Sequence, residues 1–238
     1  MKVIRILFVI ALFGCLSSTI FAQKSEVRKT GQFDQLEVFG NMSVILVKGE
    51  QEGVKIEIEG DSDISTEDVT TSVEELTLKI NTTASLFKAS DKITVYVTFK
   101  KLRRISAKGS ADIRSKELLQ GDKLELIASK GGNIYLDADV NTLDAKVSQG
   151  SVIVLDGYAK TQVVTASLDG TYSGFKFTCD NTYVKANTKG IAKVVADTYL
   201  EASAVSGGYI GYGGDVKKTD ISEKLGGKVE KVELEVTF

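Results

Sequence analysis

The sequence predicts an all-β protein: a right-handed, single-stranded parallel β-helix, or solenoid, with coils of about 20 residues and an irregular N-terminal β cap. Three observations predict it: glycine-centred turns at a nearly fixed interval, apolar residues that alternate between those turns, and the absence of proline from all 238 residues. Proline cannot donate a backbone hydrogen bond, so its absence suits a ladder in which nearly every amide donates. The handedness follows from the general rule for parallel connections.

Six glycine-centred turns occur in the second half of the chain. Their first glycines are separated by 22, 19, 20, 20 and 17 residues. These glycines are Gly109, Gly131, Gly150, Gly170, Gly190 and Gly207. A period in this range is typical of stacked structural units. We expect glycine at these corners because a positive φ angle there carries no Cβ penalty.

A fainter series of polar turns lies half a period away, from Gln120-Gly121-Asp122 to Lys218-Thr219. Each coil is therefore expected to hold two strands of about ten residues separated by turns. The segments after this second series alternate apolar and polar residues, which indicates one buried face. Those segments are Leu124–Ala128, Leu143–Val147, Val164–Leu168, Val184–Ala186 and Leu200–Ala204. Because equivalent residues recur in every coil, the pattern favours a parallel solenoid over a sandwich, barrel or propeller.

Four segments are expected along the chain. Residues 1–22 form a signal peptide, residues 23–100 form N-terminal strands that cap the helix and continue into it, residues 101–227 form the coils, and residues 228–238 form a C-terminal strand. The first segment has basic residues, then an apolar run, then Ala22, which predicts cleavage after Ala22 and export to the periplasm, the outer surface or the medium. The alternative is a lipoprotein, because Leu12-Phe13-Gly14-Cys15 resembles a bacterial lipobox, and cleavage there would leave Cys15 lipidated and the protein tethered to a membrane. Cleavage after Ala22 is favoured over this alternative.

Composition excludes several classes of function. Without Lys2 and Arg5 the chain has 28 basic and 32 acidic residues, a formal charge of −4, which does not suit a nucleic-acid partner. The absence of histidine excludes His-dependent triads and most zinc sites. Cys179 is the only cysteine of the mature chain and is expected to be a small buried hydrophobe.

Carboxylates remain the only candidates for glycosidase or lyase chemistry. They are Asp137, Asp139, Asp144 and Asp156. The turns are too short to wall a substrate cleft, so we interpret these residues as solvated charges that discourage edge pairing. We predict no catalytic residue, no metal site and no cofactor.

The candidate binding residues are mainly aromatic. Val163, Tyr183 and Tyr199 each precede an inward-facing residue, so they are expected to face outward and to stack on successive coils. Such a ladder can simply stabilise neighbouring strands, or it can form a flat platform for sugar rings or a subunit contact. Tyr209 and Tyr212 lie in the glycine-rich stretch that follows and either extend this face or pack in the core.

An ordered set of motifs carries a family resemblance. Phe33-x-x-Leu-x-Val-x-Gly40-Asn41-x-x-Val44-x-Leu-x-x-Gly49 is followed by Val54-x-Ile-x-Ile-x-Gly60 and then by the glycine turns. This order resembles the putative auto-transporter adhesin family, head GIN domain, over about Gly31 to Gly227. The resemblance implies a pectin-lyase-like β-helix without catalytic residues, a Bacteroidetes-type source, adhesion or surface binding and, by analogy with adhesins, possible homotrimers.

The expected function is that of an exported, non-catalytic binding protein, a cell-surface adhesin that recognises a host or environmental glycan or matrix protein. Two alternatives stay open. The chain can be an extracellular β-helix that processes or binds polysaccharide, or a structural envelope component that assembles with further copies of itself.

Overall fold

The computed structural model describes residues 24–60, 64–82 and 92–233. These residues form 17 strands in one hydrogen-bonded sheet and one short 3-10 helix, η1 (Thr66–Asp68). The N-terminal strands are β1 (Lys24–Lys29), β2 (Gln35–Phe39), β3 (Ser43–Lys48), β4 (Gly53–Glu59), β5 (Val69–Glu74), β6 (Thr77–Thr82) and β7 (Lys92–Phe99). The remaining strands are β8 (Arg104–Lys108), β9 (Asp112–Ser129), β10 (Asn133–Ser148), β11 (Val152–Ser167), β12 (Thr171–Asn187), β13 (Ile191–Val195), β14 (Tyr199–Val205), β15 (Tyr209–Gly213), β16 (Lys218–Lys224) and β17 (Lys228–Lys231).

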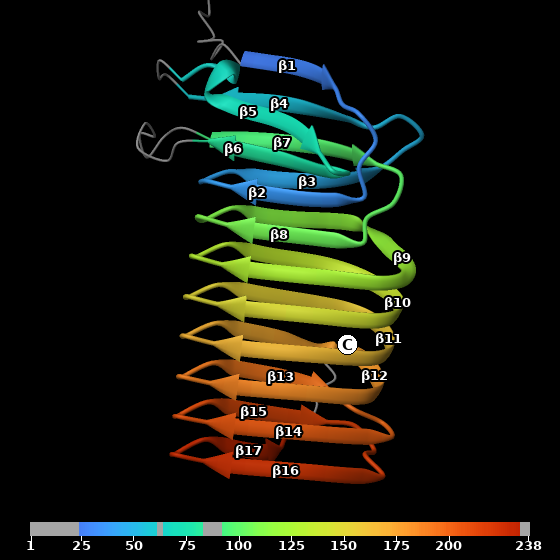
Figure 1. Ribbon diagram of the computed structural model, residues 1–238, viewed down its shortest axis with the longest axis vertical. Coiled ribbons are helices and arrows are strands. Elements are labelled where there is room, and N and C mark those ends of the chain that lie inside the picture. The colour runs from blue at the N-terminus through green and yellow to red at the C-terminus, as the bar shows by residue number, and fades with distance from the viewer. Residues whose placement is uncertain (1–23, 61–63, 83–91, 234–238) are drawn as a thin grey trace, which may run out of the picture.

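From β8 to β17 the chain is a parallel solenoid with two walls, which confirms the predicted fold class (Figure 1). The front wall contains β8, the second halves of β9 to β12, β14 and β16. The rear wall contains the first halves of β9 to β12, β13, β15 and β17. In Figure 1 the front strands run to the left and the rear strands to the right as the chain descends, which is the sense of a right-handed coil.

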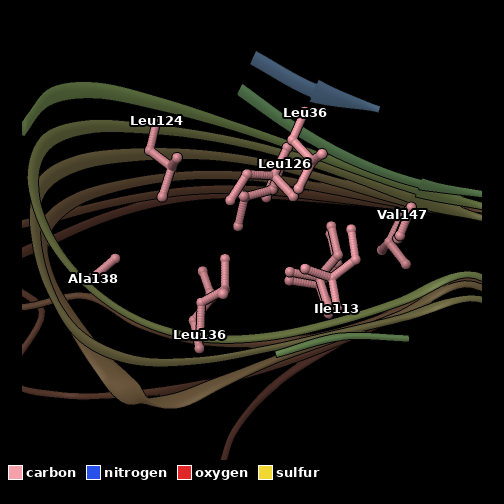
Figure 2. Close-up of a cluster of buried hydrophobic side chains, with 14 of the residues drawn as sticks. Leu36, Ile113, Leu124, Leu126, Leu136, Ala138 and Val147 are labelled. Carbon is pink, nitrogen blue, oxygen red and sulfur yellow. The ribbon is translucent and has the colours of Figure 1, made fainter. Parts of the chain in front are cut away.

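The core lies between the two walls. Burial alternates along the strands, so every second side chain faces inward. Figure 2 shows Leu36, Leu124 and Leu126 projecting from one wall toward Ile113 and Leu136 on the other. These aliphatic side chains are buried, and burial of each stabilises the fold by about 1.5–3 kcal/mol.

The glycine turns connect the front wall to the rear wall. Each of seven such turns has two consecutive residues with φ between 47° and 77°. Gly109, Gly131, Gly150 and Gly207 occupy these left-handed positions, as expected. The turns also bond to one another from coil to coil, as where the amide of Gly131 donates to the carbonyl of Gln149 (3.1 Å).

Gly170 and Gly190 do not fit the expected role, because neither has a positive φ. The left-handed positions of their turns are held by Leu168-Asp169 and Thr188-Lys189. Glycine is needed instead because a Cβ at Gly190 would lie 2.2 Å from the carbonyl oxygen of Ala166 in the preceding coil. The seven residues at this third turn position are Ala111, Gly132, Ser151, Gly170, Gly190, Gly208 and Gly227. Their spacing of 21, 19, 19, 20, 18 and 19 residues is more regular than that of the first glycines.

The turns predicted half a period away are wrong in four coils. Strands β9 to β12 are 16 to 18 residues long and continue through the bend from rear wall to front wall. Coil-to-coil pairing persists there, as between Val140 and Ala159, so the polar residues at the bend are parts of a strand. Asn141 and Lys160 are exposed, whereas Thr182 is buried. In the later coils the strand is interrupted at this bend, between β13 and β14 and between β15 and β16.

The N-terminal region is irregular, as predicted, but its strand order does not follow the sequence. β2 pairs in parallel with both β6 and β8, and β3 pairs in parallel with both β7 and β9. The β2–β3 coil therefore lies between the β6–β7 coil and the β8–β9 coil (Figure 1). Above it, β1, β4 and β7 pair antiparallel in the rear wall, and β5 and β6 pair antiparallel in the front wall.

Two sequence predictions concern residues outside the described ranges. The predicted signal peptide, residues 1–22, lies wholly outside them, and so do residues 234–238 of the predicted C-terminal strand. Within the described ranges, no helix has the length and apolar character needed to cross a membrane.

Candidate binding face

The first candidate site is on the outer surface of the front wall. Val163 and Tyr183 are partners on neighbouring coils, as predicted, and are 41% and 38% exposed. Inward-facing Val164 and Val184 follow them and are buried, so the strand pleat turns both preceding side chains to solvent. Val163, Tyr183 and Tyr199 are called the aromatic patch below.

Tyr199 faces outward on the next coil but is not in the expected register. It pairs with Asn181 and Lys218, whereas Tyr183 pairs with Glu201, a displacement of two residues along the strand. The displacement preserves which face each side chain occupies, because it is an even number of residues. The Tyr183 and Tyr199 rings still meet diagonally, with centroids 5.7 Å apart and planes inclined at 57°.

Polar side chains surround the aromatic patch. Thr161 and Asn181 flank it on one side, Thr165 and Lys185 on the other, and Glu201 lies beside Tyr183 on the next coil. The Nζ atom of Lys218 lies 5.8 Å from the Tyr199 ring centroid. Partial desolvation, then the carboxylates of Glu201 and Asp220, raise the pKa of the Tyr199 phenol. The patch thus combines exposed ring surface with hydroxyl, amide and ammonium groups, which suits contact with a hydroxyl-rich or mixed polar surface.

The other two tyrosines do not extend this face. Tyr209 lies on the outer surface of the rear wall, and its hydroxyl donates to Oε1 of Glu230 (2.8 Å), an interaction that raises the pKa of the phenol. Tyr212 pairs with inward-facing Val194 and packs against the core. The five predicted binding residues are therefore divided among the front wall, the rear wall and the interior.

The four candidate carboxylates are also divided. Asp137 and Asp156 are partners on neighbouring coils at the outer side of the bend, and Asp139 pairs with Tyr158 in the same region. Asp144 is on the front wall, where it lies 3.5 Å from Nζ of Lys146. Across residues 24–60, 64–82 and 92–233, no group of three or more carboxylate, thiol or imidazole side chains is placed to hold a metal ion.

Cys179 is fully buried, as predicted. Burial raises the pKa of its thiol to about 11, and Sγ donates to the carbonyl of Asn181 (3.2 Å). A buried, protonated thiol is a poor nucleophile, so Cys179 is a packing residue.

Sequence reasoning missed a second outer surface, on the rear wall. One side chain from each of six adjacent strands lies in a single column, which is called the rear stripe. In spatial order these residues are Lys55, Tyr96, Ile45, Arg114, Tyr135 and Val154. A signal was present, because Val152-Ile-Val-Leu155 and Val44-Ile-Leu-Val47 are apolar at every position, whereas a strand with one solvated face alternates.

Known structures show the same fold. A putative adhesin from Bacteroides fragilis matches with a TM-score of 0.80 and 16% identity, over 89% of this chain and 97% of that chain. A putative adhesin from Parabacteroides distasonis matches with a TM-score of 0.68 and 20% identity, again over 89% and 97%. A putative lipid binding protein from Parabacteroides distasonis has a TM-score of 0.68 and 17% identity over the same shares of the two chains.

No curated protein matches the chain significantly. The sequence profile of one family matches residues 32–216, which includes the strands from β2 to β15. The chain therefore belongs to the family described as putative auto-transporter adhesin, head GIN domain.

Proposed function

We propose that this protein is an exported, non-catalytic adhesin whose aromatic patch contacts a glycan or a matrix protein outside the cell. The observation that carries the proposal is the position of exposed Val163 and Tyr183 beside half-buried Tyr199 on the outer surface of the front wall. Exposed apolar groups gathered in this way on a soluble domain usually mark an interaction surface. Family membership supports a binding role, and the predicted signal peptide supports export.

The aromatic patch suits a planar ligand better than a deeply enclosed one. Tyr183 is 38% exposed, and its neighbours Thr161, Thr165 and Asn181 present short polar groups. A sugar ring offers an apolar face for stacking and peripheral hydroxyls for hydrogen bonds, so it matches both features. A single stacking contact is weak, and we expect an affinity that depends on several patches acting together.

A binding screen tests the proposal. Purified residues 23–238 are applied to arrays of glycans and extracellular-matrix proteins beside the double variant Tyr183→Ala, Tyr199→Ala. Tyr158→Ala is the matched control, because Tyr158 is also 38% exposed but lies at the bend. We expect binding that the double variant loses and the control retains. Binding retained by the double variant would place the site elsewhere, and no binding by the wild type would contradict a glycan or matrix target among those arrayed.

A further inference from the structure

The rear stripe combines four apolar or aromatic side chains with two cations on an outer surface that no described residue covers. Tyr96, Ile45, Tyr135 and Val154 are only partly buried, on strands whose opposite face already packs into the core. Val152 lies beside Val154 and Val47 beside Ile45, which widens the surface. Strands that are apolar on both faces are typical of sheets covered on both sides.

Two rings of the rear stripe are already held in place by cations. The guanidinium carbon of Arg114 lies 4.1 Å from the Tyr135 ring centroid, and Nε and Nη2 donate to the two carboxylate oxygens of Asp112 (2.8 and 3.0 Å). Nζ of Lys55 lies 5.7 Å from the Tyr96 ring centroid. Preordered tyrosine and arginine side chains lose little entropy on binding and are enriched at the energetic centres of protein interfaces.

The charges of the rear stripe are balanced locally. Lys55 pairs with Glu57 (2.6 Å) and Arg114 with Asp112, so neither cation requires a charge from a partner. A strongly charged partner is therefore not favoured. A second copy of the same surface meets no net repulsion.

We propose that the rear stripe is the interface of a homodimer, in which a second copy of this chain packs the same stripe against it. A two-fold axis parallel to the strands, between β3 and β9, makes the contact self-complementary. Tyr96 then faces Tyr135 of the second copy, and Ile45 faces Arg114. Lys55 faces Val154, so no cation opposes another cation.

The size of the surface sets the expected strength. The surface is six strands high, at about 4.8 Å per strand, and about five residues wide along each strand, at about 3.3 Å per residue. The product is an area of roughly 500 Å² per copy. The total of about 1,000 Å² is the lower limit for a specific interface. The dimer should therefore dissociate on dilution. It also leaves the aromatic patches of both copies on opposite outer surfaces.

Analytical ultracentrifugation of residues 23–238 over a range of micromolar concentrations tests the proposal. Wild type should shift from monomer to dimer as concentration rises, and Tyr135→Glu should raise the dissociation constant at least tenfold. Tyr183→Glu, on the front wall, is the matched control and should behave as wild type. Circular dichroism of each variant shows whether it is folded, and Val154→Glu provides a second test if Tyr135→Glu is not. A wild type that stays monomeric, an assembly other than a dimer, or a dimer unaffected by these rear-wall substitutions would overturn the proposal.

Cross-linking tests the orientation. Ile45→Cys places a thiol beside the proposed two-fold axis, whereas Thr165→Cys places one on the front wall. Buried Cys179 does not compete for the reagent. A short bismaleimide should join two Ile45→Cys chains and leave Thr165→Cys chains monomeric. Equal yields from the two variants would contradict the stated contact. Neither experiment requires a glycan, so failure of the dimer is distinguishable from failure of the adhesin proposal.

Discussion

The hydroxyl of Tyr172 on the rear wall donates a 2.9 Å hydrogen bond to Oε1 of Gln162 on the front wall, across the interior of the solenoid. Nε2 of Gln162 donates in turn to Oγ1 of Thr182 (3.0 Å) and to the carbonyl of Val195 (3.1 Å). All three side chains are fully buried. On the preceding coil the positions of Tyr172 and Gln162 are held by aliphatic Ile153 and Leu143. One polar pair has thus replaced an aliphatic pair in the core.

The Tyr172–Gln162 pair predicts a loss of stability that a second substitution partly reverses. Tyr172→Phe should lower the free energy of unfolding by about 1–3 kcal/mol, because Oε1 of buried Gln162 loses its donor. Adding Gln162→Leu should restore much of that loss, since Thr182 keeps its 2.9 Å bond to Val195 and leucine matches the preceding coil. Urea unfolding with an unchanged m-value measures both effects. A double variant less stable than Tyr172→Phe alone would contradict this account.

The solenoid was predictable because its signals are local. Glycine turns and alternating strands repeat in sequence, and they identify the parallel coils. The insertion of β2–β3 between β6–β7 and β8–β9 was not predictable, because it depends on which coil edges meet in space. The role of Gly190 was also hidden, since contact with the carbonyl of Ala166 requires the coil-to-coil register.

The candidate site was predictable only in part, for a related reason. Val163 and Tyr183 pair as expected because β11 and β12 are uninterrupted and of similar length. The break between β13 and β14 changes the register, so Tyr199 is displaced by two residues. The rear stripe joins Tyr96, Ile45 and Arg114, whose spatial order differs from their sequence order, and no periodicity search would align them.

Three glycine substitutions should separate two costs of a Cβ atom: its collision with the neighbouring coil and the strain of a positive φ angle. Gly190→Ala should destabilise most, by more than about 3 kcal/mol, because its Cβ would lie 2.2 Å from a backbone oxygen. Gly150→Ala should lose about 1–2 kcal/mol, since nothing lies within 4 Å but φ is +68°. Gly121→Ala, with open space and no positive φ, is the control and should be near neutral. Thermal or urea unfolding gives the ranking, and equal losses at Gly190 and Gly150 would refute the distinction.

Arg28 should hold the N-terminal cap together. Its guanidinium donates to the carbonyls of Val69 (2.5 Å) and Thr66 (2.8 Å) and pairs with Glu26 (2.7 Å). Arg28→Lys should speed amide hydrogen exchange in residues 64–74 about tenfold, because an ammonium cannot reproduce the fork of donors. Exchange in β10 should not change. Lys29→Ala, at an exposed position of the same strand, is the control.

Acid should weaken the same contact. The hydrogen bond from Arg28 lowers the pKa of the Glu26 carboxyl from 4.5 to about 2. Because the folded pKa is the lower one, the stabilisation is complete above about pH 4.5 and is lost as pH falls toward 2. Exchange in the cap should therefore accelerate over that range more in wild type than in Glu26→Gln. Parallel pH profiles for the two proteins would contradict this.

Cys179 should make stability fall at alkaline pH. Burial raises the pKa of its thiol from 9.0 to about 11, so the unfolded chain loses this proton first as pH rises. The contribution of this thiol to the free energy of unfolding is complete below pH 9 and is lost progressively between pH 9 and 11. The total loss is at most about 2–3 kcal/mol. Cys179→Ala removes this contribution, and the difference between the two urea-unfolding profiles isolates it from other titrating groups. The thiol should also react with a maleimide only on unfolding. Rapid labelling of the native protein would show that Cys179 is accessible, and would contradict both the protected thiol and its effect on stability at alkaline pH.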